Sequence, residues 1–393
     1  MMKKLLFVIM HLKMGGAERS LVNLLNEIDY KEYSVDLLLI KREGELIAQL
    51  PKSVNIIETP YELRALFSNR IEKIRGIKYF IIRGCSILYS EIYGKIKPGD
   101  NCAVRWNGFY DKAIPMLGRE YDVAISYLAG PSMFYVANKV NAKKKIVFIH
   151  SDYVASGAVI GKKTDMPYFE KYDLIPTISE QCRNSLVKEF PDMADKFVVV
   201  PNITSTRLIE VRSSRFAPEE YKGKRNIICS IGRLNNAKGF DMAVQAAALL
   251  KSKRFAFDWF IIGEGEERRG LQEIITKNKL EDCFFLLGIR DNPYPYMKNA
   301  DIVVQSSRYE GKSMVLDEAK ILAKPIVATN YTTVRDQLTD EEGLIVEMTP
   351  EGIANGIQKM LENESLRKKF SKYLKQRDYG NTNEMQKFYD ILK

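Results

Sequence analysis

The 393-residue chain lacks the features of a membrane-spanning or disulfide-bonded protein. No apolar run reaches the roughly 18 residues that a transmembrane helix needs. The opening MMKKLLFVIM is followed by His11 and Lys13 instead of a small-residue cleavage site, so it predicts a β-strand and not a signal peptide. The five cysteines are scattered, without a Cys-x-x-Cys pair, which argues against a disulfide framework and against a zinc site. We therefore expect a cytoplasmic protein.

Repeats, low-complexity segments and D-x-D triplets are also missing from the sequence. A chain this long exceeds what one hydrophobic core supports, so two domains are expected. Histidine is scarce, because only His11 and His150 occur, and both follow predicted strands. A histidine satisfied inside the fold is the commoner case, and we prefer that interpretation for His11.

Positive charge is in excess, with 60 Lys and Arg against 50 Asp and Glu. Such a chain can meet nucleic acid, an anionic membrane or a phosphorylated ligand. Part of the excess lies in residues 61–97, where basic residues alternate with apolar ones at roughly helical spacing. This pattern is typical of a helix on an anionic leaflet, although surface helices with a solvated basic face would show it too. We expect residues 61–97 to bind an anionic membrane, so that the protein attaches peripherally to the inner face of the plasma membrane, and we expect no nucleic-acid partner.

Short apolar runs alternate with segments long enough for crossover helices, which predicts doubly wound parallel sheets. In the first half the predicted strands are 5–10, 35–40, 54–57, 123–126, 146–149 and 197–200. Residues 201–224 have mixed charge and no period, so they are interpreted as the linker region. In the second half the predicted strands are 227–231, 259–262, 284–287, 302–304, 326–328 and 344–346. Between the third and fourth of these, the sequence DNPYP is interpreted as a turn. The predicted domains are 1–203 and 204–375, with 376–393 as a C-terminal helix that packs back on the first domain.

Two loops that follow predicted strands carry the candidate binding chemistry. Ligands of doubly wound folds bind outside the carboxyl ends of the strands. After strand 227–231 comes GRLNNAKGF, in which Arg233 and Lys238 precede a helix N-terminus. Two cations beside free amides favour a diphosphate, although alone they would suggest only a solvated loop.

The second loop follows strand 302–304 and contains Glu310 and Gly311. Gly311 lets backbone approach a ligand, and free amides near Ser313 and Met314 can bind phosphate or sugar oxygens. Glu318 lies further along the helix, about 7 Å away at 1.5 Å per residue. That spacing suits one carboxylate binding the two hydroxyls of a ribose next to a diphosphate.

These motifs resemble the retaining family-four glycosyltransferases of the GT-B fold. The quoted elements are GRL…KG followed by E-G-x-x-x-x-x-x-E-A, together with MGGAER, FIHSD, PNITSTRL, IIGEGEER and LLG. Each is weak alone, but their order and spacing hold over nearly the whole chain. The resemblance implies an α/β protein with two Rossmann-like domains facing a cleft, the nucleotide-sugar bound mainly in the second.

The resemblance also implies roles for single residues. The catalytic set is Glu310, His150, Arg233 and Lys238, with Arg233 and Lys238 neutralising the diphosphate and His150 contacting donor sugar and acceptor. The donor-binding set is Gly15, Gly16, Arg233, Lys238, Gly288, Ile289, Glu310, Gly311, Lys312, Ser313, Met314, Val315 and Glu318. Gly288 and Ile289 are expected to recognise the base, and Glu318 the ribose. No metal is expected, because the cations replace it.

The chain departs from the family where E-G-F-G is common, since Lys312 and Ser313 follow Gly311 here. This variant most resembles members that build bacterial capsule or exopolysaccharide. The implied reaction is hexosyl transfer from a nucleoside-diphosphate sugar, a UDP-hexose, to a saccharide on a polyprenyl diphosphate.

Other functions remain open at this stage. Glu310 and Glu318 could form a glycosidase pair, but a cationic phosphate loop has no purpose there. A non-catalytic GT-B subunit and a hydrolysing nucleotide-sugar epimerase share the fold. The G-x-G at 263–265 suggests a dinucleotide fingerprint, but Arg268 replaces its third glycine, so an oxidoreductase is disfavoured.

Overall fold

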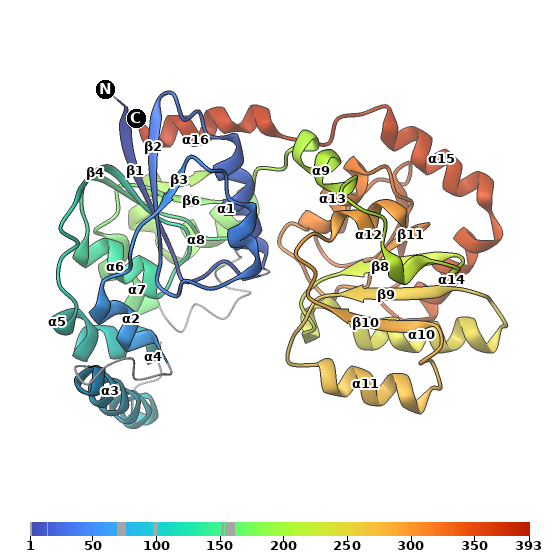
Figure 1. The fold of residues 1–393 in the computed structure, drawn as a ribbon, viewed down its shortest axis with the longest axis horizontal. Coiled ribbons are helices and arrows are strands. Elements are labelled where there is room, and N and C mark those ends of the chain that lie inside the picture. Colours follow the sequence, from blue (N-terminus) through green and yellow to red (C-terminus); the bar gives the residue numbers. More distant parts are fainter. Residues whose placement is uncertain (1, 14, 69–75, 97–100, 151–152, 154–161) are drawn as a thin grey trace. The chain divides into compact units, whose positions relative to one another are not determined.

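The computed structural model describes residues 2–13, 15–68, 76–96, 101–150, 153 and 162–393. The chain forms two compact units, one of Met1–Ile203 with Asn383–Lys393 and one of Thr204–Thr382 (Figure 1). Each unit has a parallel sheet covered on both faces by helices, as short runs of buried Val, Ile and Leu predict.

The first unit is built on a five-stranded sheet with the order β3-β2-β1-β4-β5. Its strands are β1 (Lys3–Ile9), β2 (Tyr33–Leu39), β3 (Val54–Ile56), β4 (Glu120–Ser126) and β5 (Asn141–Val147). A further parallel pair, β6 (Ile175–Thr177) and β7 (Phe197–Val199), continues it through two isolated bridges from the β5 side.

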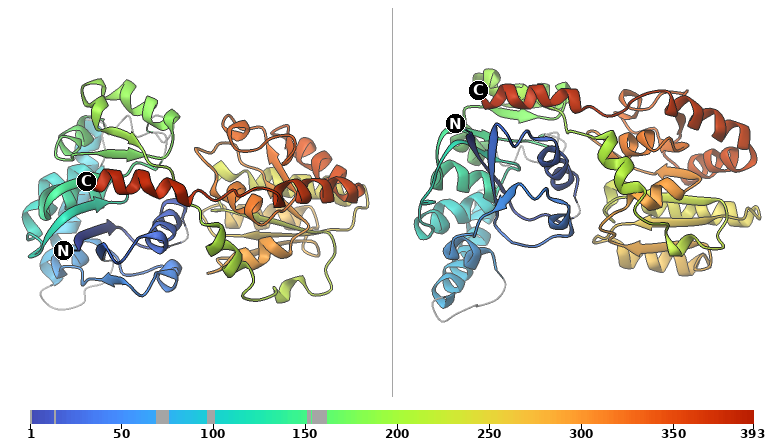
Figure 2. Two further views of the ribbon diagram at one scale, coloured as in Figure 1. Left: turned by 90° about the horizontal axis from the view of Figure 1, so that it is seen from above. Right: turned by 45° about the horizontal axis from the view of Figure 1, so that its top comes forward.

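Helices cover both faces of this sheet. The helices of the first unit are α1 (Gly16–Glu27), α2 (Tyr61–Phe67), α3 (Gly76–Ile96), α4 (Asn101–Arg105), α5 (Asp111–Ala113), α6 (Pro131–Lys139), α7 (Lys162–Phe169), α8 (Glu180–Glu189) and α16 (Met385–Leu392). Helices α1 and α16 share a core with one face of the sheet, and both views in Figure 2 show α16 against this unit.

The second unit has a six-stranded parallel sheet with the order β10-β9-β8-β11-β12-β13. Its strands are β8 (Ile227–Ile231), β9 (Asp258–Ile262), β10 (Phe284–Gly288), β11 (Ile302–Gln305), β12 (Ile326–Thr329) and β13 (Gly343–Val346). Its helices are α9 (Thr206–Ser213), α10 (Phe240–Ser252), α11 (Arg268–Lys277), α12 (Tyr294–Asn299), α13 (Met314–Ile321), α14 (Pro350–Glu362) and α15 (Glu364–Lys375). Helices α10, α11, α14 and α15 pack on one face, and α12 and α13 on the other.

Three details differ from the sequence prediction. The predicted linker 201–224 contains helix α9, which packs against α12 and α13 and therefore belongs to the second unit. That unit ends at Thr382 and not at 375, because Asp378 and Asn381 hydrogen-bond to Thr206 and Thr204. The last two residues of the turn-like DNPYP, Tyr294 and Pro295, already belong to α12, since proline is well tolerated in the first turn of a helix.

Candidate active site

The site expected in the second unit lies at the point in its sheet where the strand order reverses, between β8 and β11. Strand β8 has β9 on one side and β11 on the other, so crossovers leave it in opposite directions. Ligands of open parallel sheets bind at such switch points, beyond the carboxyl ends of the strands. The segments that follow β8 and β11, residues 232–239 and 306–313, are therefore the ones that can meet a ligand together.

An ion pair joins these two segments. Lys238 Nζ lies 2.5 Å from Glu310 Oε1, and the two side chains are 22% and 12% exposed. The same oxygen accepts hydrogen bonds from Gln305 Nε2 at 2.8 Å and Ser307 Oγ at 2.7 Å. Three donors on one oxygen fix the Glu310 carboxylate next to the Lys238 ammonium.

Two hydrogen bonds to backbone carbonyls hold the two segments next to each other. Ser306 Oγ donates to Lys238 O at 2.9 Å, and Arg308 N donates to Ala237 O at 2.8 Å. Gly239 between Lys238 and α10 has φ of +60°, and a Cβ there would lie 2.2 Å from Ser306 O. Glycine at this position allows the close approach.

Arg233 does not join this pair. It is 67% exposed, and its guanidinium lies 3.2 Å from Glu266 in the neighbouring loop after β9. To bind a diphosphate beside Lys238, Arg233 would have to exchange this exposed carboxylate for phosphate oxygens. The exchange is energetically accessible, because exposed ion pairs contribute little.

In residues 311–315, the backbone beside Gly311 has free space, whereas Ser313 already makes hydrogen bonds within the protein. A Cβ on Gly311 would meet nothing within 4 Å, so the backbone there has free space beside it. Ser313 N, expected to be free, instead donates to Gln337 Oε1 at 2.7 Å, and Ser313 Oγ caps α13. The amides of Met314 and Val315 at the start of α13 are therefore the better candidates for a phosphate. Lys312 Nζ lies 3.8 Å from Asp317.

Glu318 has no exposed surface. Its Oε1 accepts a hydrogen bond from Tyr294 Oη of α12 at 3.0 Å. The predicted ribose contact therefore requires the side chain, or what covers it, to move. The expectation of an accessible carboxylate overlooked this burial, because helical spacing gives distance along α13 but not what packs against it.

The expected base-binding residues lie at the end of β10. Gly288 has φ of +76°, and its carbonyl accepts from Gly263 N at 3.0 Å, while the Ile289 carbonyl accepts from Arg290 Nη1. These contacts fix the backbone next to the loop after β9, and the Ile289 side chain is half-buried.

In the first unit, Gly15 and Gly16 form the N-terminus of α1. A Cβ on Gly15 would lie 2.1 Å from Glu18 Oε2, whereas a Cβ on Gly16 would meet none of the described residues within 4 Å. Gly16 thus leaves room beside the backbone, as the donor-approach role requires. Met14 of the same motif, and Ser151 and Asp152 of FIHSD, lie outside the described residues.

His150 lies in a polar cluster at the carboxyl edge of the first sheet. Its Nδ1 is 3.2 Å from Asn202 Oδ1, which also accepts from Ser20 Oγ, and its ring is 4.7 Å from that of Tyr127. Burial lowers the pKa of His150 to about 4, so the imidazole is neutral at pH 7. Because Asn202 Oδ1 can only accept, the proton resides on Nδ1 and Nε2 keeps its lone pair. Nε2 is buried and has no hydrogen-bond partner among the residues that the structure describes.

His11 differs from His150. Burial first, and then Lys13, lower its pKa, and its Nδ1 is 3.7 Å from Glu18. The imidazole thus contacts Lys13 in its own loop and Glu18 in the first turn of α1, which fits the structural role predicted for it.

Sequence reasoning missed three residues that hold the site side chains. Gln305 donates to Glu310 and accepts from Ser313 Oγ at 2.9 Å, Tyr294 donates to Glu318, and Asn202 contacts His150. Gln305 had a signal, because it is the polar end of the apolar run IVVQ. Tyr294 had none, since nothing local links α12 to α13.

Within the described part of the chain, no three His, Cys, Asp or Glu side chains group so that they could hold a metal ion. None of the helices described there is both long and apolar enough to cross a bilayer.

Residues 211–377 match the family model described as glycosyl transferases group 1. Among curated relatives, the chain is 28% identical over 265 residues to the Campylobacter jejuni N-acetylgalactosamine-N,N'-diacetylbacillosaminyl-diphospho-undecaprenol 4-alpha-N-acetylgalactosaminyltransferase, covering 67% of this chain and 66% of the relative. It is 29% identical over 175 residues to the Erwinia amylovora amylovoran biosynthesis glycosyltransferase AmsD, covering 44% and 49%. The chain thus spans less than two thirds of the length of these relatives.

Solved structures resemble the chain over its full length. S. aureus TarM, in a complex that contains UDP, aligns with a TM-score of 0.69 at 17% identity, covering 100% of both chains. Anabaena HepE, in complex with UDP and glucose, aligns with a TM-score of 0.68 at 16% identity, covering 99% of both. Both likenesses concern the fold, and the expected GT-B architecture is confirmed.

Proposed function

We propose that this chain, a member of the group 1 glycosyltransferases with the GT-B fold, transfers a hexose from a UDP-sugar to a lipid-linked saccharide. The product would be an intermediate of a bacterial surface polysaccharide. The proposal includes retention of the anomeric configuration and independence of a metal ion.

The observation that carries the proposal is the Lys238–Glu310 pair at the switch point of the second sheet. A cation and a carboxylate, both mostly buried, stand beside the N-terminus of α13, and two further hydrogen bonds fix the carboxylate. A diphosphate placed there would meet Lys238 and the first amides of α13, while Glu310 would face the attached sugar. A donor phosphate would then displace Glu310 from Lys238.

In the proposed reaction, the bond between the anomeric carbon and the β-phosphate oxygen breaks while a bond to the acceptor oxygen forms on the same face. The acceptor proton passes to a β-phosphate oxygen, so no side-chain nucleophile is needed. Lys238 and Arg233 stabilise the growing charge on the diphosphate, which is the contribution that lowers the barrier. Neutral His150 would contact the sugar or acceptor through Nε2, which requires the groups that bury this nitrogen to move.

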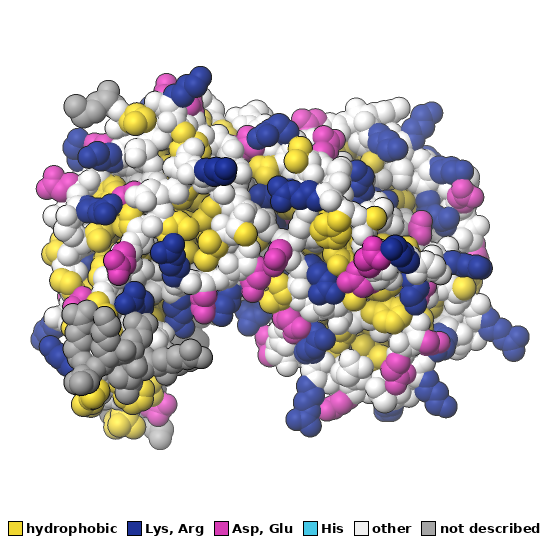
Figure 3. Space-filling model, in the orientation of Figure 1, with side chains coloured by type: hydrophobic (Ala, Val, Ile, Leu, Met, Phe, Trp, Pro, Cys, Tyr) yellow, Lys and Arg dark blue, Asp and Glu magenta, His cyan; other side chains and the backbone are white. Residues whose placement is uncertain are grey.

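A lipid-linked acceptor is supported by the Campylobacter relative, whose name specifies a diphospho-undecaprenol substrate. Helix α3 adds a second argument, because it exposes large apolar side chains repeated at helical spacing. They are Ile77, Phe80, Ile81, Leu88, Tyr89 and Ile92, each 46–63% exposed. Figure 3 shows hydrophobic side chains at this end of the first unit. We propose that α3 docks on an anionic leaflet; Arg70, Lys73, Arg75 and Lys97 of the predicted basic stretch lie outside the described residues.

The transfer is tested by incubating the protein with UDP-hexoses and polyprenyl-diphosphate-linked saccharides, and measuring UDP release and the anomeric configuration of the product. Lys238→Ala and Glu310→Gln should each lower kcat about 10²- to 10³-fold, as the loss of a preorganised charge does in other enzymes. Lys253→Ala, an exposed lysine beyond the end of α10, serves as the control. Normal turnover of an Arg233→Ala/Glu310→Gln variant would favour the non-catalytic subunit.

Docking is tested by co-flotation with anionic vesicles. Wild-type protein should float with them at low salt and dissociate at high salt, because the attraction is screened. Leu88→Glu/Ile92→Glu should abolish flotation, while Val211→Glu, an equally exposed apolar position in the second unit, should not. No flotation, or flotation unchanged by salt, contradicts electrostatic docking.

A further inference from the structure

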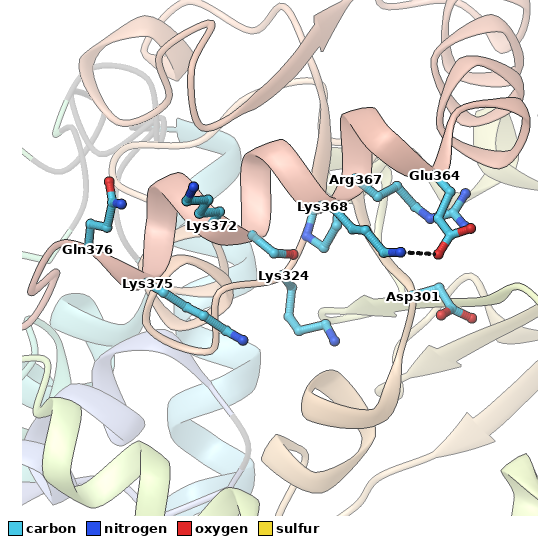
Figure 4. Close-up of a pocket in the computed structure, with 10 residues that line it drawn as sticks. Asp301, Lys324, Glu364, Arg367, Lys368, Lys372, Lys375 and Gln376 are labelled. Carbon is cyan, nitrogen blue, oxygen red and sulfur yellow. Dashed lines mark ion pairs between the residues drawn. The ribbon is translucent and has the colours of Figure 1, made fainter.

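A second candidate binding site lies at the opposite end of the strands that carry the proposed donor site. A cavity of about 530 Å³ is lined by Asp301 before β11, by Lys324 and Pro325 before β12, and by one face of α15 (Figure 4). The lining residues from α15 and its end are Glu364, Arg367, Lys368, Ser371, Lys372, Lys375 and Gln376. Glu310 and Lys238 follow the carboxyl ends of β11 and β8, so the two sites lie at opposite edges of one sheet.

The cavity is strongly cationic, with five basic side chains against two carboxylates. Both carboxylates are already engaged, because Glu364 pairs with Lys368 at 2.7 Å and Asp301 Oδ2 accepts from Ile227 N at 2.8 Å. Arg367 donates to Leu361 O at 3.2 Å near the end of α14, which gives it a structural role.

The remaining cations, Lys324, Lys372 and Lys375, form no ion pair with any described residue. Lys324 Nζ donates to a backbone carbonyl, Lys298 O at 2.9 Å. Burial lowers the pKa of Lys324, and Lys375 adds to this lowering while Asp301 opposes it. Among the described residues, the side chains of Lys372 and Lys375 have no hydrogen-bond or ion-pair partner. Figure 4 shows Lys324 and Lys375 extending on the same side of α15.

We propose that this cavity binds a phosphate-bearing anion between Lys324 and the Lys372–Lys375 turn of α15. The lining contains one apolar residue, Pro325, and no aromatic ring, so it offers nothing to a base or an acyl chain. Clustered ammonium groups on two elements instead suit a compact phosphate with two or more charges. The anion can be a soluble phosphate or a phospholipid headgroup, and the inference does not depend on the proposed transfer reaction.

Inorganic pyrophosphate is the probe for the soluble source. Calorimetric titration at low ionic strength is carried out in an Arg233→Ala/Lys238→Ala background, which removes the cations of the donor site. Saturable binding is expected, weakened at least tenfold by Lys372→Ala/Lys375→Ala. The matched control Lys359→Ala/Lys369→Ala removes equal charge from α14 and α15 at exposed positions outside the cavity, and should change affinity less than twofold.

Vesicles of phosphatidylglycerol and phosphatidylcholine test the lipid source, in a Leu88→Glu/Ile92→Glu background so that α3 does not contribute. Flotation that requires Lys372 and Lys375, without saturable pyrophosphate binding, identifies a headgroup; saturable pyrophosphate binding alone identifies a soluble phosphate. The proposal is overturned if neither probe binds, or if the control pair weakens binding as much as the cavity pair.

Discussion

His150 can be examined as a single residue, because the chain has just one other histidine. Its native pKa of about 4 is below the ordinary histidine pKa of 6.5. Between these values the unfolded chain binds a proton that the native state does not, so this histidine lowers the free energy of unfolding as pH falls from 6.5 to 4. The full effect is about 3 kcal/mol, since one pKa unit corresponds to roughly 1.4 kcal/mol.

The measurement is a proton NMR titration of the imidazole Hε1 signals, with His150→Gln to assign them. The His150 signal should not shift above pH 5, and the variant should lose part of the stability decrease between pH 6.5 and 4. A midpoint near 6.5 for His150 would show that its ring is hydrated and would remove the argument for a neutral hydrogen-bonding role.

Tyr294 and Tyr296 allow a matched test of the buried Glu318. Tyr294 Oη donates to Glu318, whereas Tyr296, on the same helix, contacts Glu220. A hydrogen bond to a charged group contributes about 1.5–3 kcal/mol, so Tyr294→Phe should raise the Kd for UDP about tenfold if Glu318 binds ribose. Tyr296→Phe should leave it unchanged. Calorimetric titration with UDP measures both Kd values. If Tyr294→Phe binds UDP with the wild-type Kd but has a lower Tm, the role of Glu318 is purely structural.

At the scale of elements, the strands were the most predictable part. The run IICSI predicts 227–231, and β8 has those bounds, because a buried parallel strand is a short apolar run bounded by polar residues. Strand β6 was missed, since three residues including Pro176 give no such run. Helix α12 was missed for a similar reason, because two prolines in DNPYP suggest a turn as much as a helix start.

The candidate site was predictable in part for the same reason. Lys238 and Glu310 each follow a strand, and the order of strands in a parallel sheet brings such positions together. Two features of the site depend on side chains from other elements. Arg233 points toward Glu266, and Glu318 is buried. Neither the spacing nor the motif contains that information.

Gly239 tests how the two loops are held together. Its φ is +60°, and a Cβ would lie 2.2 Å from Ser306 O. Gly239→Ala should therefore lower the free energy of unfolding of the second unit by at least about 2 kcal/mol. Gly311→Ala is the control, because its Cβ meets nothing and its backbone is unstrained, so stability should change little. Urea unfolding measures both; a Gly239→Ala variant as stable as wild type would show that the loops can separate without cost.

At the scale of the whole molecule, the C-terminal helix joins the first unit although the chain has passed through the second. Met385, Phe388, Ile391 and Leu392 of α16 are buried in the core beside β1 and β2. Phe388 contacts Phe7 at 6.2 Å between ring centroids, and Tyr389 stacks on Tyr33 at 5.4 Å. The last eleven residues therefore contribute to the stability of the unit that begins the chain.

The two tryptophans make this contribution measurable in each unit separately, because Trp106 is buried in the first and Trp259 in the second. Phe388→Ala should lower the free energy of unfolding of the first unit by about 3–5 kcal/mol, the usual cost of truncating a buried phenylalanine. With Trp259→Phe the fluorescence reports the first unit, and its urea midpoint should fall. With Trp106→Phe it reports the second, whose midpoint should not move. Lys387→Ala, exposed on the same helix, should change neither. A parallel loss at both tryptophans would mean that the units unfold as one cooperative body.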